Sequence, residues 1–212
     1  MNSKLRVGLT MRLDSPSEYS EMRSSISQDW IELIHKLNFV AVPILNSLAL
    51  NKAHIEDLKI DALILTNGGE SNVGLGGELN KNCDERDHTE LQVFKFALQN
   101  KLPILGVCRG MQFIYRFYGG DIEKLENKTH VATENYIICT DKSTRLVGCY
   151  HELACSSLKV PSQLEIWAKS SDGVIEGLRH KSKPILGIQW HPERMHSSMQ
   201  EDFLIIQNFL KK

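Results

Sequence analysis

A cysteine bracketed by glycines is the clearest chemical feature of this chain. The stretch Gly106-Val107-Cys108-Arg109-Gly110 follows an apolar run and precedes a helical pattern, which is the G-x-nucleophile-x-G arrangement of a sharp strand-to-helix turn. Such a turn exposes the nucleophile, and the helix N-terminus favours the thiolate. A cysteine taken alone is more often a buried core residue, but the bracketing and the context predict that Cys108 is a nucleophile.

A histidine and a glutamate near the other end of the sequence fit the requirements of such a thiol. A cysteine nucleophile needs an imidazole, and the imidazole needs a third group that fixes its tautomer. In GIQWHPER, His191 ends an apolar strand and Glu193 follows two residues later. His-Pro-Glu by itself would more often be a solvated turn. Its place at the end of a glycine-containing strand favours a catalytic triad of Cys108, His191 and Glu193.

A glycine pair supplies candidate donors for an oxyanion. Gly68 and Gly69 directly follow the buried run ALILT, so a backbone N–H there can face the nucleophile without an intervening Cβ. The N–H of Arg109 is the second candidate. Such a donor is worth on the order of 3 kcal/mol in the transition state. The alternative is an ordinary turn at the end of a strand, and no phosphate-binding G-x-x-x-x-G-K-[ST] motif follows.

Apolar runs and helical periodicities alternate in the first half of the chain, which predicts an α/β fold. We expect buried parallel strands at 5–10, 62–66 and 103–107, and amphipathic helices at 24–37 and 86–100. Shorter alternating pieces at 135–140, 163–170, 173–180 and 184–190 suggest hairpins added to the sheet, and 198–212 predicts a closing helix. One domain over 1–212 is favoured, and the glycine-rich loop at 70–85 is a candidate lid.

Composition excludes several classes of function. With 25 basic and 26 acidic residues, the net charge of -1 favours neither nucleic acid nor an anionic membrane as a partner. The N-terminus resembles neither a secretory signal nor a membrane span, so we expect a cytoplasmic protein. Its five cysteines form no C-x-x-C pair, which argues against a disulfide framework or a zinc site and predicts reduced thiols.

Taken together, Gly68-Gly69, GVCRGMQ and HPE resemble a class I glutamine amidotransferase domain over nearly the whole chain. Within that family, RDHTE (86–90), YHELA (150–154) and DGVIEGL (172–178) are most similar to the gamma-glutamyl hydrolase-like branch. The resemblance implies a flavodoxin-like, mostly parallel sheet flanked by helices. It also implies a gamma-glutamyl thioester on Cys108, and a reaction that needs no metal or organic cofactor.

The resemblance also implies which residues contact the substrate. The amides of Gly69 and Arg109 would hold the oxyanion, and the substrate-binding residues would be Gly68, Glu70, Gln112, His151 and Arg12. Two departures bear on this. Asn67 stands where the family often has Pro or Gly, and YHELA matches the branch's Asn-Ser-x-His-x-Gln pattern only in part. His151 is therefore either a pocket residue or a packed strand histidine.

The substrate implied by the resemblance is a gamma-glutamyl amide that is cleaved to release glutamate. The chain looks most similar to enzymes that act on a gamma-glutamyl-CDP-amidate in capsular phosphoramidate synthesis, with Arg12, Arg23, Arg109 or Arg194 near the diphosphate. The alternatives are a gamma-glutamyl-GABA hydrolase, a glutaminase subunit that supplies ammonia to a separate synthetase, and a non-catalytic binding module. The sequence also leaves a homodimer open.

Overall fold

One large mixed sheet organises the computed structural model, which describes residues 4–15, 21–126 and 128–211. Its strand order is β4-β1-β5-β6-β13-β12-β11-β8-β9. The parallel part consists of β4 (Val40–Ile44), β1 (Arg6–Thr10), β5 (Ala62–Leu65), β6 (Ile104–Val107) and β13 (Ile185–Ile188). The antiparallel part consists of β12 (Ile175–His180), β11 (Leu164–Ser170), β8 (Val131–Cys139) and β9 (Thr144–Tyr150).

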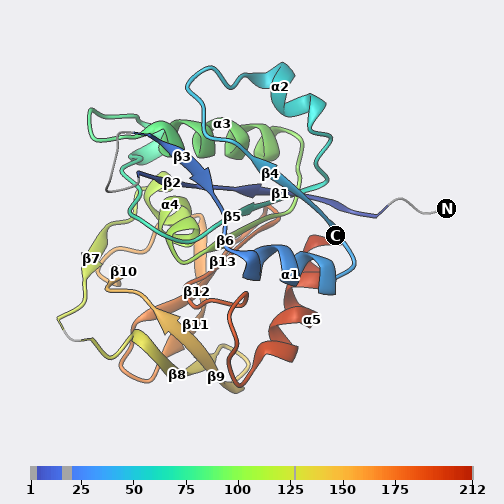
Figure 1. The fold of residues 1–212 in the computed structure, drawn as a ribbon. Coiled ribbons are helices and arrows are strands. Elements are labelled where there is room, and N and C mark those ends of the chain that lie inside the picture. Colours follow the sequence, from blue (N-terminus) through green and yellow to red (C-terminus); the bar gives the residue numbers. More distant parts are fainter. Residues whose placement is uncertain (1–3, 16–20, 127, 212) are drawn as a thin grey trace.

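Helices cover both faces of the parallel part (Figure 1). One core joins the sheet to α1 (Gln28–Lys36) and α5 (Met199–Leu210). The other joins it to α2 (Lys52–Asp57), α3 (Glu85–Gln99) and α4 (Arg109–Phe117). Because both faces are covered, the parallel strands read as continuous apolar runs. Within the described ranges, every helix is too short or too polar to cross a bilayer.

Two small hairpins lie outside the large sheet. β2 (Arg12–Asp14) pairs with β3 (Arg23–Ser25), and β7 (Ile122–Lys124) pairs with β10 (Leu153–Cys155). A short 3-10 turn, Leu75–Gly77, interrupts the loop between β5 and α3.

The prediction of an α/β fold with a mostly parallel sheet and antiparallel additions is confirmed. Three local predictions differ. The first helix begins at Gln28 rather than at 24, because β3 ends at Ser25 and Ser27 caps the helix. β4 was not expected because it contains Pro43, which an edge strand tolerates. The piece at 184–190 is not part of an outer hairpin, because β13 lies beside β6 within the sheet.

The pairing of β6 with β13 positions the candidate site. Their parallel register sets Val107 opposite Ile188, and the Cys108 amide donates a hydrogen bond of 2.8 Å to the Ile188 carbonyl. The residues that follow these two strands therefore emerge at the same edge of the sheet, although more than 80 positions separate them in the sequence.

Candidate active site

Cys108 occupies a strained turn between β6 and α4. Its φ of 51° and ψ of -105° place it in the left-handed half of the map, where a residue with a side chain is costly. The flanking glycines are required by space. A Cβ on Gly110 would lie 2.1 Å from the Leu65 carbonyl oxygen, and one on Gly106 would lie 2.6 Å from Gly110 backbone atoms. The sharp strand-to-helix turn expected at Cys108 is therefore present.

His191 is held by a carboxylate. Its Nδ1 lies 2.7 Å from Glu193 Oε1, and Pro192 separates the two residues along the turn. An Nδ1–H that donates to Glu193 leaves Nε2 as the nitrogen that serves the thiol. His191 Nε2 is buried and, among the described residues, makes no hydrogen bond to nitrogen or oxygen. The ring interacts with the Cys108 sulfur by charge and hydrogen bonding.

The thiol and the imidazole shift each other's ionisation. Burial alone would raise the pKa of Cys108, but the charge and hydrogen bond of His191 lower it below its ordinary value. Burial alone would lower the pKa of His191, but Cys108 and Glu193 raise it to about 9. The pair therefore exists as thiolate and imidazolium at neutral pH, which provides both a nucleophile and a proton donor.

This ionisation predicts how reactivity depends on pH. Below about 9 the His191 proton is present, so iodoacetamide should alkylate Cys108 rapidly already at neutral pH. Turnover should fall as the pH rises through about 9, because the proton for the leaving nitrogen is then lost. Burial raises the pKa of Cys83, which makes that thiol an internal control that reacts only in more alkaline solution. Peptide mass mapping of both sites would contradict the ion pair if the two cysteines shared one pH profile.

The glycine pair after β5 has the conformation that an oxyanion wall requires. Gly68 and Gly69 have φ values of 91° and 73°, which favour glycine, and the space beside the Gly69 α-carbon is open. The second expected donor is the amide of Arg109, the first residue of α4, which no acceptor within the helix can use. Both backbone segments border the turn that carries Cys108, so the geometry is compatible with the predicted oxyanion hole.

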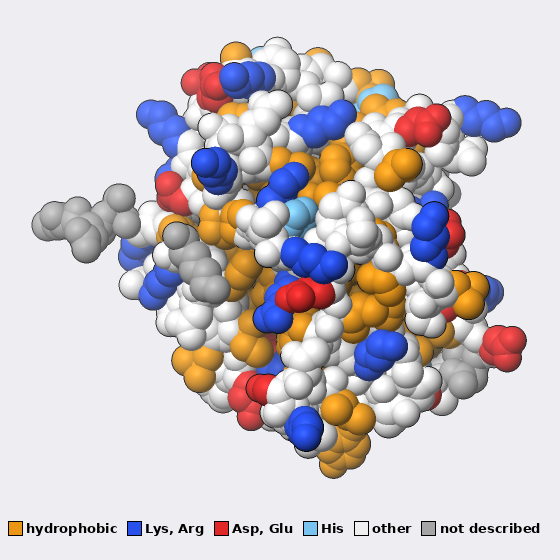
Figure 2. All heavy atoms as spheres, turned by 180° about the vertical axis from the view of Figure 1, so that it is seen from behind, with side chains coloured by type: hydrophobic (Ala, Val, Ile, Leu, Met, Phe, Trp, Pro, Cys, Tyr) orange, Lys and Arg blue, Asp and Glu red, His pale blue; other side chains and the backbone are white. Residues whose placement is uncertain are grey.

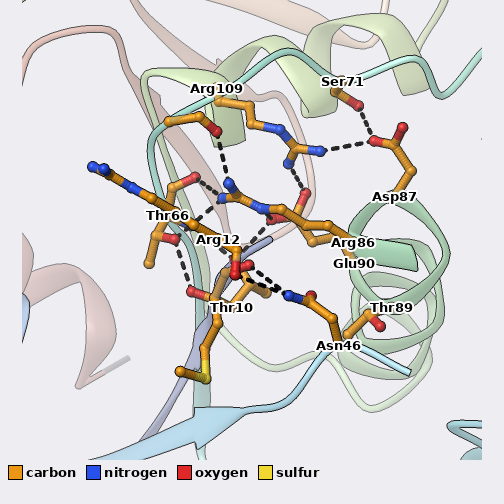
Figure 3. A network of polar contacts seen from close by, with 12 residues as sticks. Thr10, Arg12, Asn46, Thr66, Ser71, Arg86, Asp87, Thr89, Glu90 and Arg109 are labelled. Atoms are coloured by element: carbon orange, nitrogen blue, oxygen red, sulfur yellow. Dashed lines mark hydrogen bonds and ion pairs between the residues drawn. The ribbon is translucent and has the colours of Figure 1, made fainter. Parts of the chain in front are cut away.

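A buried ion network stands behind this wall (Figure 3). The Arg86 guanidinium is 2.9 Å from Glu90 and donates to the carbonyls of Gly68 (2.6 Å) and Thr66 (2.8 Å). The Arg109 guanidinium also pairs with Glu90. Burial alone would raise the pKa of Glu90, but the two guanidiniums hold it below its ordinary value. The network therefore fastens the Gly68 backbone to α3 through charge-assisted hydrogen bonds.

This network corrects one prediction for the arginines. The Arg109 side chain does not reach toward a diphosphate, because it is fully buried, pairs with Asp87 at 2.8 Å and donates to the Glu70 carbonyl at 3.1 Å. Only its backbone borders the turn. Asp87 also accepts from Ser71 at 2.9 Å, so the start of the 70–85 loop is tied to α3. A lid function of that loop stays a prediction.

A cavity of about 430 Å³ opens beside Cys108 and His191. Every residue expected to bind substrate lines it, namely Arg12, Gly68, Glu70, Gln112 and His151. Arg194 and Lys124 also line it, whereas Arg23 does not and pairs with Glu21 at 2.6 Å. On the face shown in Figure 2, Lys and Arg side chains gather around a depression in which a histidine is visible. A negatively charged substrate would find basic groups at this opening.

Sequence reasoning missed the part that Asn67 plays. Its side-chain amide donates to Glu193 Oε1 at 3.0 Å and lies 2.9 Å from His191 Nδ1, and its carbonyl accepts from Trp30 Nε1 at 3.0 Å. Because Nδ1–H already donates to Glu193, the productive bond of the amide is the one to the carboxylate. The departure from Pro or Gly at this position thus places a buried side chain behind the imidazole.

Replacing Asn67 with alanine should reduce kcat/KM about 10-fold, because the His191 and Glu193 pair loses a fixed partner and its orientation loosens. The matched control is Trp30→Phe, which removes the other hydrogen bond of Asn67 and leaves the Glu193 contact in place. Steady-state rates on one substrate, with thermal melting of each variant, separate orientation from stability. Equal losses in the two variants would assign Asn67 to packing alone.

The family model of class I glutamine amidotransferases matches residues 18–212. The chain belongs to the class I glutamine amidotransferase family. The family expected from the cysteine, histidine and glycine motifs is thereby confirmed. Among relatives of this amidotransferase, a gamma-glutamyl-CDP-amidate hydrolase from Campylobacter jejuni is 31% identical, with 89% of this chain and 90% of the relative covered.

A second relative of this amidotransferase is a glutamine-hydrolyzing GMP synthase subunit from Methanocaldococcus jannaschii. It is 29% identical, and the match covers 86% of this chain and 91% of the relative. A crystal structure of a GMP synthase-like protein from Thermoplasma acidophilum aligns over 100% of this chain and 94% of its own, with a TM-score of 0.68 at 19% identity. That last likeness shows the fold alone. The family and its relatives support an amidohydrolase that acts on a C–N amide bond.

Proposed function

We propose that this chain is a cysteine amidohydrolase that cleaves a gamma-glutamyl amide with Cys108, His191 and Glu193. The observation that carries the proposal is the thiol in the strained turn, whose pKa is lowered by an imidazole that a carboxylate orients. A structural cysteine has no need of a strained backbone or of an ionised partner. A binding module without catalysis explains neither feature.

The proposed reaction has two stages. The Cys108 thiolate attacks the gamma-carbonyl carbon, and the amides of Gly69 and Arg109 hold the negative oxygen. The tetrahedral intermediate collapses as His191 gives its Nε2 proton to the leaving nitrogen, so the C–N bond breaks and a gamma-glutamyl thioester remains. The neutral imidazole then takes a proton from water, which attacks the thioester. The C–S bond breaks, and glutamate and the thiolate are released with the imidazolium restored.

A gamma-glutamyl-CDP-amidate is the substrate that we propose. The likeness to the Campylobacter jejuni enzyme supports it, and so does the charge around the cavity. Arg12, Lys124 and Arg194 line one cavity with the thiol, and Arg side chains suit bidentate contact with phosphate oxygens. Hydrolysis would release glutamate and the nucleotide amidate. A gamma-glutamyl-GABA would leave these cations without a diphosphate to contact.

The likeness to the glutamine-hydrolyzing component of GMP synthase favours a second candidate, a glutaminase subunit that delivers ammonia to a separate synthetase. Its substrate, free glutamine, has the same gamma-glutamyl half, so the triad geometry fits both candidates. They differ in the leaving group and in the partner. A glutaminase subunit depends on its synthetase for full activity, whereas a free-standing hydrolase does not.

The test is a comparison of kcat/KM for gamma-glutamyl-CDP-amidate, L-glutamine and gamma-glutamyl-GABA, with glutamate release followed by mass spectrometry. We expect the nucleotide amidate to exceed the other two by at least about 100-fold, the range that loss of paired charged contacts produces. Faster turnover of gamma-glutamyl-GABA would make the substrate proposal wrong. Glutamine turnover that rises when a synthetase is added would favour the glutaminase candidate.

Arg12→Ala tests the diphosphate contact directly. We expect KM for the nucleotide amidate to rise about 10-fold or more, because a charged hydrogen bond is lost, while KM for glutamine stays unchanged. The control is Arg23→Ala, which alters an arginine on the neighbouring strand β3, outside the cavity. Arg12 packs against Gly68, and a disturbed oxyanion wall would instead lower kcat for both substrates. That common loss would contradict a role of Arg12 in substrate selection.

A further inference from the structure

Four buried side chains converge next to the cavity and take no part in the proposed chemistry except through His151. They are His130, which immediately precedes β8, Cys149 on β9, His151, which immediately follows β9, and Glu176 on β12. One ligand atom from each lies within 4.8 Å of those from the others. All four side chains are buried. A thiol, two imidazoles and a carboxylate are the groups from which proteins build zinc sites.

The outer nitrogens of the two imidazoles are already occupied. His130 Nε2 lies 3.0 Å from Asp172 Oδ2, and His151 Nδ1 lies 3.1 Å from the Leu153 carbonyl oxygen. Metal-bound histidines usually donate their second N–H to a carboxylate or to a backbone carbonyl, and here each partner type occurs once. The inward nitrogens, His130 Nδ1 and His151 Nε2, are therefore left for the centre of the cluster.

The centre of the cluster is poorly satisfied by the protein itself. His151 Nε2 and both carboxylate oxygens of Glu176 make no hydrogen bond of acceptable geometry among the described residues. They approach only as ion pairs, with Glu176 Oε1 3.1 Å from His130 Nδ1 and 3.4 Å from His151 Nε2. Buried polar atoms normally have partners, so an arrangement with several unsatisfied inward atoms calls for a bound group.

We propose that His130, Cys149, His151 and Glu176 form a tetrahedral site for Zn²⁺. Bonds of about 2.0 to 2.3 Å to a tetrahedral metal place its ligand atoms roughly 3.3 to 3.8 Å apart. The two measured separations to Glu176 are already close to that range, and the largest separation in the cluster requires a contraction of about 1 Å. The thiolate and imidazole donors select zinc over calcium and magnesium, which prefer oxygen ligands.

Four protein ligands make this a closed site, so its role is structural rather than catalytic. The metal ties the β8–β9 hairpin to β12. It also fixes His151, whose side chain lines the cavity beside Cys108. The site takes no part in the thioester chemistry, and its existence does not depend on the substrate proposed above. The absence of a C-x-x-C pair hid it in the sequence, because its ligands come from separate strands.

Metal content and affinity test the proposal. The full-length chain, purified without chelators, should contain about one Zn²⁺, and Co²⁺ in its place should give the visible absorption of a tetrahedral thiolate complex. Cys149→Ser removes the soft ligand and should abolish that absorption. Cys108→Ala should leave zinc content unchanged, which excludes a metal held by the catalytic thiol. Zinc lost from Cys108→Ala but kept by Cys149→Ser would overturn the assignment.

A second variant decides the matter if Cys149→Ser fails to fold. Asp172→Asn alters the half-exposed carboxylate that contacts His130 and leaves all four ligands in place. Loss of such an outer partner typically weakens metal binding 10- to 100-fold, and we expect a loss of about that size in competition titrations with a chromogenic chelator. An unchanged affinity, or no zinc bound by the unaltered chain at equilibrium with excess metal, would leave a metal-free network of shared protons and end the proposal.

Discussion

Cys108→Ala is expected to reduce turnover by at least about 10⁴-fold while the fold stays intact. The reason is that each stage of the proposed reaction passes through a covalent bond to this sulfur, and the oxyanion donors alone retain only a small residual acceleration. The strained turn should become no less stable, since the smaller alanine side chain relieves crowding at a φ of 51°. Steady-state glutamate release and thermal melting measure the two quantities separately.

A matched control for this prediction is Cys155→Ala. Cys155 is a second buried free thiol, and burial raises its pKa well above the ordinary value, so it has no nucleophilic character at neutral pH. Its replacement should leave turnover near that of the unaltered chain. Trapping of a gamma-glutamyl adduct by mass spectrometry should succeed in the control and fail in Cys108→Ala. Turnover that survived the loss of Cys108 would remove the nucleophile and, with it, the proposed mechanism.

Glu90→Ala is expected to have the largest effect on stability, about 3 to 5 kcal/mol. Glu90 is fully buried and contacts both Arg86 and Arg109, while Asp87 is the remaining acid of the network. Without Glu90, two buried guanidiniums share one carboxylate, so a net positive charge is left in the interior. The free energy of unfolding, obtained from urea titration with an unchanged m-value, measures the loss.

Two comparison variants isolate the effect of the buried charge. Glu85→Ala alters an exposed acid in the first turn of the same helix and should cost less than about 1 kcal/mol. Glu90→Gln keeps the shape but removes the charge, and it should fall between the other two. Because Arg86 donates to the Gly68 carbonyl, the folded fraction of Glu90→Gln should also show a lower kcat. A Glu90→Ala variant as stable as Glu85→Ala would show that the network adds no net stability.

The chemistry-bearing segments could be predicted because each is locally defined. The glycines around Cys108 are dictated by contacts of a single turn with β5 and with each other, so their spacing is visible in the sequence. The buried parallel strands are likewise visible as apolar runs, because both of their faces are covered. β4 was missed for the opposite reason, since an edge strand relaxes the rule against proline.

Contacts between segments could not be predicted in this way. RDHTE was informative as a resemblance, yet its sequence does not reveal that Arg86 and Glu90 fasten the glycine wall through Arg109. The arginine after the nucleophile looked like a phosphate ligand for the same reason. A guanidinium on a solvated surface and one in a buried ion network are identical in the sequence, and only the surrounding carboxylates distinguish them.

The sequence by itself determined the α/β class, the family and the nucleophilic turn, because these depend on residues close together along the chain. Only the tertiary structure decided which side chains meet. The register of β6 and β13 brings the Cys108 and His191 segments to one edge, Asn67 reaches the carboxylate behind the imidazole, and the hairpin of β8 and β9 meets β12 around four inward ligand atoms. Each of these is a distance across the fold, and linear spacing carries no information about such distances until the strands have paired.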